Sequence, residues 1–175
     1  MRLPNLSLIL GGAASGKSAF AENLLLRAQR PAVYIATAQA FDAEMEAKIA
    51  AHQQARGPGW RLIEAPTNLP AALASVQPNE AVLIDCATLW LSNLLLADAD
   101  TNSATTALIT ALTTCPAPIV IVSNETGQGV VPDNALARRF RNAQGQLNQT
   151  LAAQAELAVL VIAGLPMVLK GTIPS

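Results

Sequence analysis

The sequence predicts an α/β fold, in which helices cover both faces of a mostly parallel sheet. Six short runs rich in apolar or β-branched residues recur along the chain, and helical stretches separate them. The runs are residues 6–10, 32–36, 61–64, 81–84, 119–123 and 157–162. Strands without polar alternation are typical of sheets buried on both sides. We therefore expect a three-layer α/β sandwich.

The stretches between these runs have helical spacing. Helices are predicted at residues 19–29, 42–55, 88–96, 103–114 and 134–154. The polar segment 98–106 is interpreted as a mobile surface loop. The apolar segment 157–169 contains a glycine and a proline and is too short to span a bilayer. We interpret it as two buried strands joined by a turn, and residues 1–175 as a single domain.

Composition excludes several functional classes. The chain has eleven Lys and Arg residues and twelve Asp and Glu residues, which gives a net charge of -1. No overall positive field therefore exists to attract nucleic acid or an anionic membrane. Cys86 and Cys115 are far apart in sequence and lack metal-ligand spacing, which favours reduced thiols in the cytoplasm. The first apolar run ends at Gly11, before reaching the length of a signal peptide core.

The charges are unevenly distributed along the chain. Every Lys and Arg lies in residues 2–61 or 138–170, and seven acidic residues stand between those blocks. Glu80, Asp98 and Asp100 are interpreted as parts of a solvated face. Asp85 and Glu125 each follow an apolar strand, so they need another explanation.

Residues 11–18, GGAASGKS, fit the pattern GxxxxGKS between a predicted strand and a predicted helix. This context is that of a P-loop, which we call the phosphate loop. Its backbone N–H groups and the start of the following helix would bind phosphate oxygens. Lys17 would reach the β and γ phosphates, and Ser18 would offer its hydroxyl to Mg²⁺.

Magnesium bound to a nucleotide also needs a carboxylate, usually one that ends a neighbouring strand. Asp85 is the preferred candidate, and Glu125, two residues further from its apolar run, is the alternative. Asp85 is also placed to cap the next helix, which would be a purely structural role.

The phosphate loop alone leaves the reaction open. None of the lysines lies in an Asn-Lys-x-Asp motif, so a regulatory GTPase is disfavoured. A small-metabolite kinase remains possible as an interpretation. Such a kinase usually closes a basic lid over the phosphates, and Arg138, Arg139 and Arg141 could supply it. On periodicity alone, His52 is a boundary residue between an apolar and a charged helix face.

Several segments together resemble one known family. They are GGAASGKS, YIATA, KIAAHQQARGPGW, EAP, DCATLWLSNLL, VSNETGQGVVP, ARRFRNAQGQLNQTLA and AGLPMVLK, in this order. The set closely resembles the bifunctional adenosylcobinamide kinase / adenosylcobinamide-phosphate guanylyltransferase family of cobalamin biosynthesis. The similarity covers residues 8–170, and its most specific part is NETGQGVVP with the downstream RFR and NQ.

The resemblance implies a P-loop fold with two activities. One phosphorylates adenosylcobinamide from ATP or GTP, and the other transfers GMP from GTP to the product through a GMP-histidine intermediate. It implies Mg²⁺, a trimeric homo-oligomer, and His52 as the nucleophile, because His52 lies three residues after Ile49. The implied nucleotide-binding residues are Gly11, Gly12, Ala13, Ala14, Ser15, Gly16, Lys17, Ser18, Ala36, Thr37, Ala38, Gln53, Gln54, Ala55, Arg56, Glu64 and Asp85, with Ser18 and Asp85 holding the metal.

The chain departs from the family pattern in three places. Ala14 stands where an arginine is common, RFRN replaces RFRD, and Glu156 replaces an aspartate. None of these changes removes a proposed catalytic group. For Arg138 and Arg141, substrate-phosphate binding and surface ion pairs are equally compatible with the sequence.

Overall fold

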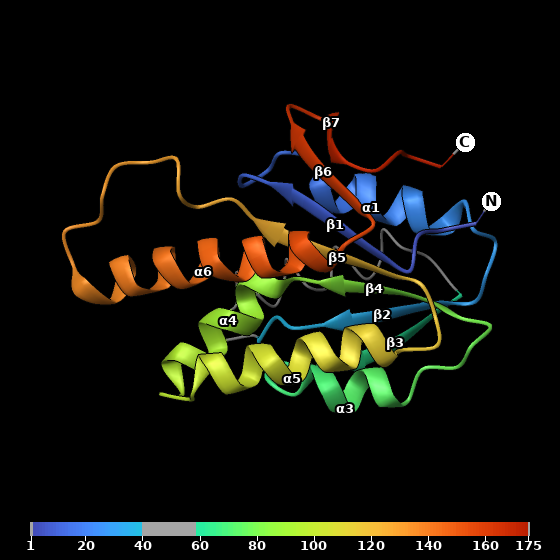
Figure 1. Cartoon of the computed structure of the whole chain (residues 1–175), viewed down its shortest axis with the longest axis horizontal. Helices are drawn as coiled ribbons and strands as arrows, with labels where there is room; N and C mark the ends of the chain where they lie inside the picture. Colours follow the sequence, from blue (N-terminus) through green and yellow to red (C-terminus); the bar gives the residue numbers. More distant parts are fainter. Residues whose placement is uncertain (1, 40–58, 175) are drawn as a thin grey trace.

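The computed structural model describes residues 2–39 and 59–174. A seven-stranded sheet runs through this part in the order β3-β2-β4-β5-β1-β6-β7 (Figure 1). The first six strands pair in parallel, and β7 is antiparallel to β6. The strands are β1 (Leu6–Gly11), β2 (Ala32–Ala36), β3 (Trp60–Glu64), β4 (Ala81–Asp85), β5 (Ile119–Asn124), β6 (Leu157–Ile162) and β7 (Leu165–Lys170).

Helices cover both faces of the sheet, which confirms the predicted α/β class. On one face, α1 (Lys17–Leu26) packs across β1, β4, β5 and β6. The opposite face is covered by helices that come later in the chain (Figure 1). They are α3 (Leu69–Ala74), α4 (Ala87–Leu96), α5 (Thr101–Thr114) and α6 (Ala135–Gln154).

The core is divided into two layers by the sheet. Ile9 on β1 belongs to the cluster that packs with α1, whereas Leu8 and Leu10 belong to the cluster on the other face. This alternation follows from the geometry of a strand, whose successive side chains point to opposite faces. Because both faces are covered, the central strands have to be apolar at consecutive positions.

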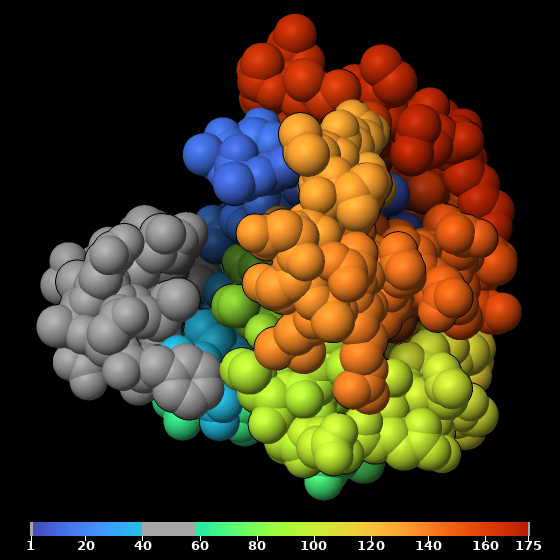
Figure 2. Space-filling view, turned by 90° about the vertical axis from the view of Figure 1, so that its left-hand side faces the viewer, coloured from blue at the N-terminus to red at the C-terminus, as the bar shows by residue number. Residues whose placement is uncertain are grey.

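The carboxyl ends of the parallel strands meet at one edge of the sheet. In register, Ala36 lies beside both Glu64 and Asp85, and Gly11 lies beside Asn124. Figure 2 looks onto this edge, where the segment after β1, in blue, lies next to the segment after β5, in orange. Open α/β sheets place their ligands at this edge.

Two predictions about elements were wrong, and one helix was not predicted. β7 is a strand, but all of its residues are exposed, so it is not the buried strand expected from its apolar sequence. Much of the predicted loop 98–106 is helical, because α5 begins at Thr101 after the cap residue Asp100. The short helix α3 was not predicted, although Asn68 caps it and a proline lies in its first turn.

Glu80 does not lie on a solvated face as predicted. Its carboxylate is largely buried and accepts two hydrogen bonds from Arg61, at 3.0 and 2.8 Å. The Arg61 hydrogen bond lowers the pKa of Glu80 below its ordinary value. Asp98 and Asp100 are exposed, as expected.

The predicted helix at residues 42–55 lies outside the described residues. Among the helices at residues 2–39 and 59–174, none has the length and apolar character needed to cross a bilayer.

Candidate active site

The phosphate loop connects the central strand β1 directly to α1. Its last residues, Lys17 and Ser18, form the first turn of α1. That turn contains no acidic residue, and no side chain caps it. The N–H groups at its start are therefore available for an external anion, and the helix dipole favours one there. The Nζ of Lys17 donates to the Gly12 carbonyl at 3.0 Å, which keeps the ammonium group at the loop.

Close contacts explain why glycine is needed at two positions of this loop. Gly16, the residue before α1, has φ +91° and lies against Gly164 of the β6–β7 turn, where a Cβ would come within 3.1 Å of the Gly164 Cα. At Gly11, a Cβ would come within 2.7 Å of the Val161 carbonyl oxygen, a backbone atom of β6, and the Ser15 hydroxyl lies close to the same place. The Gly164 N–H also donates to the Ser15 carbonyl at 2.8 Å. The hairpin β6–β7 thus supports the phosphate loop from one side.

Asp85 ends β4 and is partly buried. Its side chain lies on the α1 face, because β4 alternates and Leu83, two residues earlier, packs on that face. The Tyr34 hydroxyl donates to Oδ2 of Asp85 at 3.2 Å. The carboxylate is therefore held on the side of the sheet where Lys17 and Ser18 begin their helix.

The segment after β2 is tied to the segment after β4. The Thr37 hydroxyl accepts from the Cys86 N–H at 2.7 Å and donates to the Cys86 carbonyl at 2.8 Å. Asn93 of α4 donates to the Thr37 carbonyl at 2.8 Å. Thr37 is fully buried. Its hydroxyl is thus engaged in holding Cys86, and Ala36 and Ala38 lie on either side of it, partly exposed.

Glu64 and Glu125 end two other strands at the same edge. Glu64 is the exposed last residue of β3, in register with Ala36. Glu125 directly follows β5, and its N–H donates to the Gly11 carbonyl at 3.1 Å. Its carboxylate accepts from the Gly127 N–H at 2.6 Å. Because β5 lies between β4 and β1, Glu125 is next to the strand that leads into the phosphate loop. Asp85, at the end of β4, is separated from that strand by β5.

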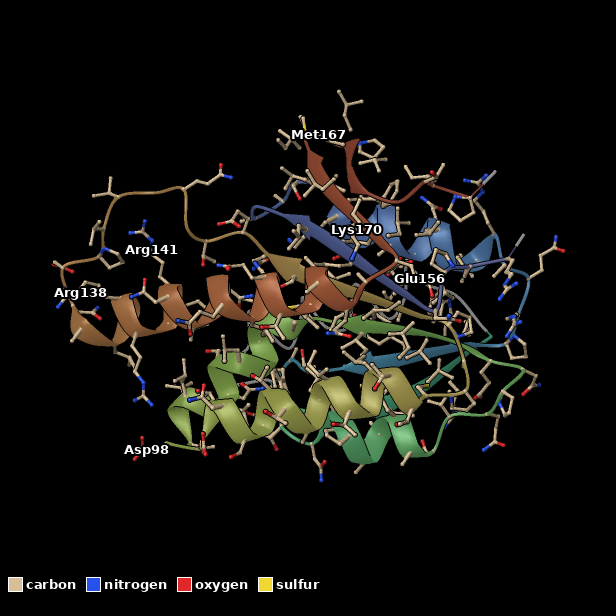
Figure 3. All side chains as sticks on the ribbon, in the orientation of Figure 1. Asp98, Arg138, Arg141, Glu156, Met167 and Lys170 are labelled. Carbon is tan, nitrogen blue, oxygen red and sulfur yellow. The ribbon has the colours of Figure 1, made fainter. Side chains whose placement is uncertain are left out.

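Arg138 and Arg141 hold the loop that joins β5 to α6. Arg141 donates to the Gly127 carbonyl at 2.7 Å, and Arg138 donates to the carbonyls of Pro132 and Asp133 at 3.0 and 2.7 Å. Figure 3 shows both side chains on the first part of α6, beside this loop. Arg139 approaches Asp98 at 4.0 Å, an exposed contact. The sequence did not suggest this backbone-binding role of the two arginines.

A buried polar cluster under the end of β5 was also missed. The Ser123 hydroxyl donates to Oδ1 of Asn148 at 2.6 Å, and Gln144 donates to both groups at 2.9 Å. The Asn148 amide donates to the Asn124 carbonyl at 3.0 Å. The available sequence signal was the pair Ser123–Asn124, two polar residues that end an otherwise apolar strand.

Five of the predicted site residues cannot be placed. His52, Gln53, Gln54, Ala55 and Arg56 lie outside the described residues. The structure brings together the phosphate loop, Asp85, Glu125 and the end of β2 at one edge of the sheet, with Glu64 at its far side.

A phosphate loop between a central parallel strand and a helix, with carboxylates on neighbouring strands, defines a P-loop nucleotide-binding protein. An ATPase of the bacterial type III secretion system has a similar fold, with a TM-score of 0.54 and 12% identity; the match covers 94% of this chain and 57% of that one.

Sequence comparison narrows this class to a single family. Residues 7–169 match the family model described as "Cobinamide kinase / cobinamide phosphate guanyltransferase". The bifunctional adenosylcobalamin biosynthesis protein CobP of Pseudomonas aeruginosa is 47% identical, over 94% of this chain and 96% of its own length. The bifunctional adenosylcobalamin biosynthesis protein CobU of Escherichia coli is 40% identical, over 93% of this chain and 98% of its own length. The chain belongs to this family.

Proposed function

We propose that the protein phosphorylates adenosylcobinamide and then transfers GMP from GTP to the phosphate, giving adenosylcobinamide-GDP. The observation that carries this proposal is the phosphate loop with Lys17 at the start of an uncapped helix, in a chain that belongs to this family. The acceptor of the kinase step is the aminopropanol hydroxyl, and its donor is ATP or GTP.

The second reaction would proceed through His52. Its neutral imidazole nitrogen attacks the α-phosphorus of GTP, a bond to that phosphorus forms, and pyrophosphate leaves. A phosphate oxygen of the corrinoid then attacks the same phosphorus and releases the histidine. Lys17 would stabilise the negative charge that develops on the phosphates in both steps. The same loop thus serves both reactions.

The oxygen donors at the site fit a magnesium ion. Mg²⁺ is usually held by one or two carboxylates together with substrate phosphates, so a dense cluster of protein ligands is not required. No group of three or more His, Cys, Asp or Glu side chains suited to a metal occurs at residues 2–39 and 59–174. Ser18 and Asp85 would hold the ion, which would neutralise phosphate charge when bound.

Assembly and location complete the proposal. We propose a homo-oligomer, and the exposed apolar side chains of the edge strand β7 support it: Leu165, Met167, Val168 and Leu169. Sedimentation velocity should show an assembly that Met167→Glu weakens, whereas a monomeric wild type would contradict this part. Free cysteines support a reducing compartment, and we place the reactions in the cytoplasm.

The central experiment is intact-mass measurement after incubation with GTP and Mg²⁺. The expected result is an added mass of one GMP on the wild-type chain. A chain that remains unmodified while it phosphorylates adenosylcobinamide would contradict the covalent step and leave only the kinase.

A further inference from the structure

Several buried polar side-chain atoms in the described part of the chain have no hydrogen-bond partner within it. Within the described part of the chain, five buried side-chain atoms have no hydrogen-bond partner: Ser7 Oγ, Ser15 Oγ, Asn124 Oδ1, Thr126 Oγ1 and Gln144 Oε1. Native proteins rarely leave such atoms unpaired, because burial without a partner is unfavourable. Three of the five, at residues 15, 124 and 126, lie in or next to the segments that meet at the phosphate loop.

Asn124 is placed beside the phosphate loop by the register of the sheet. It is the last residue of β5 and the direct neighbour of Gly11 on β1. Its side chain lies on the α1 face, since Val122, two residues earlier, packs on that face. Ser15 also lies over Gly11, with its hydroxyl where a Cβ would be. Asn124 and Ser15 therefore flank the start of the loop with unpartnered oxygen atoms.

The backbone of Asn124 is fixed on both sides. Its N–H donates to the Thr88 hydroxyl of α4 at 2.7 Å. Its carbonyl accepts from Asn148 of α6 at 3.0 Å, and Asn148 is itself held by Ser123 and Gln144. Two helices thus orient this residue, while the Oδ1 atom of its carboxamide has no hydrogen-bond partner among residues 2–39 and 59–174. A rigidly supported group without an internal partner has the properties of a preorganised binding group.

The chemistry of a carboxamide indicates what it binds here. Its nitrogen donates hydrogen bonds and its oxygen accepts them, and it neither takes nor loses a proton near neutral pH. Phosphate oxygens need donors, whereas an alcohol that attacks phosphorus presents an O–H that needs an acceptor. The kinase step brings these two groups together at the terminal phosphate.

We infer that Asn124 contacts both reactants of the phosphoryl transfer. Its Nδ2 donates to the terminal phosphate of the nucleoside triphosphate, and its Oδ1 accepts from the acceptor hydroxyl; this inference rests on the proposed function. The hydroxyl oxygen bonds to the γ-phosphorus while the bond from that phosphorus to the β–γ bridging oxygen breaks. The nucleoside diphosphate leaves, and the hydroxyl proton is released to water. Asn124 orients the groups and stays neutral throughout.

Asn124→Ala tests this assignment without breaking an internal side-chain hydrogen bond. Calorimetric titration with a non-hydrolysable GTP analogue and with GDP gives the preference for a triphosphate over a diphosphate. We expect this preference to fall roughly tenfold in the variant, the loss of one charge-assisted hydrogen bond. Ser7→Ala is the matched control, since it removes another unpartnered buried atom from the same sheet face, four residues before Gly11 on β1. It should leave the preference unchanged.

Kinetics and thermal unfolding separate this role from a structural one. In Asn124→Ala, kcat for adenosylcobinamide phosphorylation should fall about a hundredfold, and the nucleotide KM should rise about tenfold because the contact to the terminal phosphate is lost. The GMP labelling of the chain at saturating GTP should stay within about threefold. The melting temperature should be unchanged or higher, because the variant loses an unpaired buried atom. Asn148→Ala removes hydrogen-bond partners from Ser123, Gln144 and Asn124, so this variant should have a lower melting temperature than the wild type.

Three outcomes would decide against the inference. They are an unchanged preference for triphosphate, a kcat within threefold of the wild type, or a melting temperature that falls as in Asn148→Ala. A wild type that does not phosphorylate adenosylcobinamide would instead contradict the proposed function. The triphosphate preference measured without corrinoid would then still decide whether Asn124 contacts the terminal phosphate.

Discussion

The hydroxyl of Tyr34 donates to Oδ2 of Asp85 across the neighbouring strands β2 and β4, at 3.2 Å. Tyr34 is only 7% exposed, and its ring packs edge-on against Trp60 with centroids 6.1 Å apart. The phenol is therefore fixed by the core, and it fixes one oxygen of the carboxylate. The other oxygen keeps a defined direction on the α1 face, which a metal ligand requires.

Asp85→Asn should raise the Mg²⁺ concentration needed for half-maximal nucleotide turnover by roughly tenfold or more, since the shape is kept and the charge is lost. Magnesium titrations of the steady-state rate measure this. Tyr34→Phe, which removes the orienting hydrogen bond and keeps the ring, should have a smaller effect. If Glu125→Gln shifts the requirement and Asp85→Asn does not, Glu125 is the metal carboxylate.

Lys17→Ala should reduce both half-reactions by about a hundredfold or more, because it removes a positive charge from the phosphates as they acquire negative charge. Its folded stability should change little, since within residues 2–39 and 59–174 the Lys17 side chain donates only to the exposed Gly12 carbonyl. Lys170→Ala provides the contrast. Lys170 binds the last carbonyls of α6 at residues 152 and 153, so its loss should lower stability and leave turnover near wild type. Normal turnover in Lys17→Ala would show that the nucleotide binds elsewhere.

His52→Asn should abolish labelling from α-phosphate-tagged GTP and largely spare the kinase step, which needs no histidine nucleophile. The label on denatured wild type should be lost in mild acid and kept in base, as expected for a phosphoramidate on imidazole. An alkali-labile label would indicate a serine or threonine ester. Transfer of GMP by His52→Asn would argue against the covalent mechanism.

Glu80→Gln should destabilise the protein by about 1–2 kcal/mol at pH 7, since partly buried charged hydrogen bonds to Arg61 are weakened. The Arg61 hydrogen bond lowers the pKa of Glu80 in the folded chain below the ordinary value near 4.5. The ionised Glu80 carboxylate therefore contributes its full stabilisation at pH values above 4.5. This contribution is lost as the pH falls through the pKa that Glu80 has in the folded chain.

Urea unfolding of the wild type and Glu80→Gln at neutral and acid pH measures this difference, which should narrow towards pH 3. Asp98→Asn is the control, because the pair of Asp98 and Arg139 is exposed and 4.0 Å long. It should change stability by less than about 0.5 kcal/mol. A constant difference between wild type and Glu80→Gln at all pH values would contradict the assigned ion pair.

The sequence predicts the strands and the phosphate loop well, because both depend on local patterns. Residues 32–36 and 157–162 are strands with the expected bounds, and the loop lies between a strand and a helix as its motif requires. The apolar residues of β7 were misinterpreted for a physical reason. An apolar strand pattern shows that burial is favourable, but it does not show whether the covering surface comes from the same chain.

Two of the features that sequence reasoning missed are long-range polar contacts. Glu80 is paired with Arg61, nineteen positions earlier in the chain, and Asn148 reaches back to Asn124. Neither contact follows a helical or strand period, so neither leaves a local signal in the sequence. The first two residues of α5, Thr101 and Asn102, were missed because threonine and asparagine have low helix propensity; there the Asp100 cap contributes to stabilisation.

The position of β1 in the centre of the sheet has a consequence for biosynthesis. This strand, at residues 6–11, is made before its partners β5 and β6, which are residues 119–124 and 157–162. Gly164, which contacts Gly16, is made later still. During synthesis β1 must therefore wait for residues 157–162 before both of its edges are covered, and such non-local pairing is slow. A nascent chain that stops before residue 157 would lack a neighbour of β1 and the support of its phosphate loop.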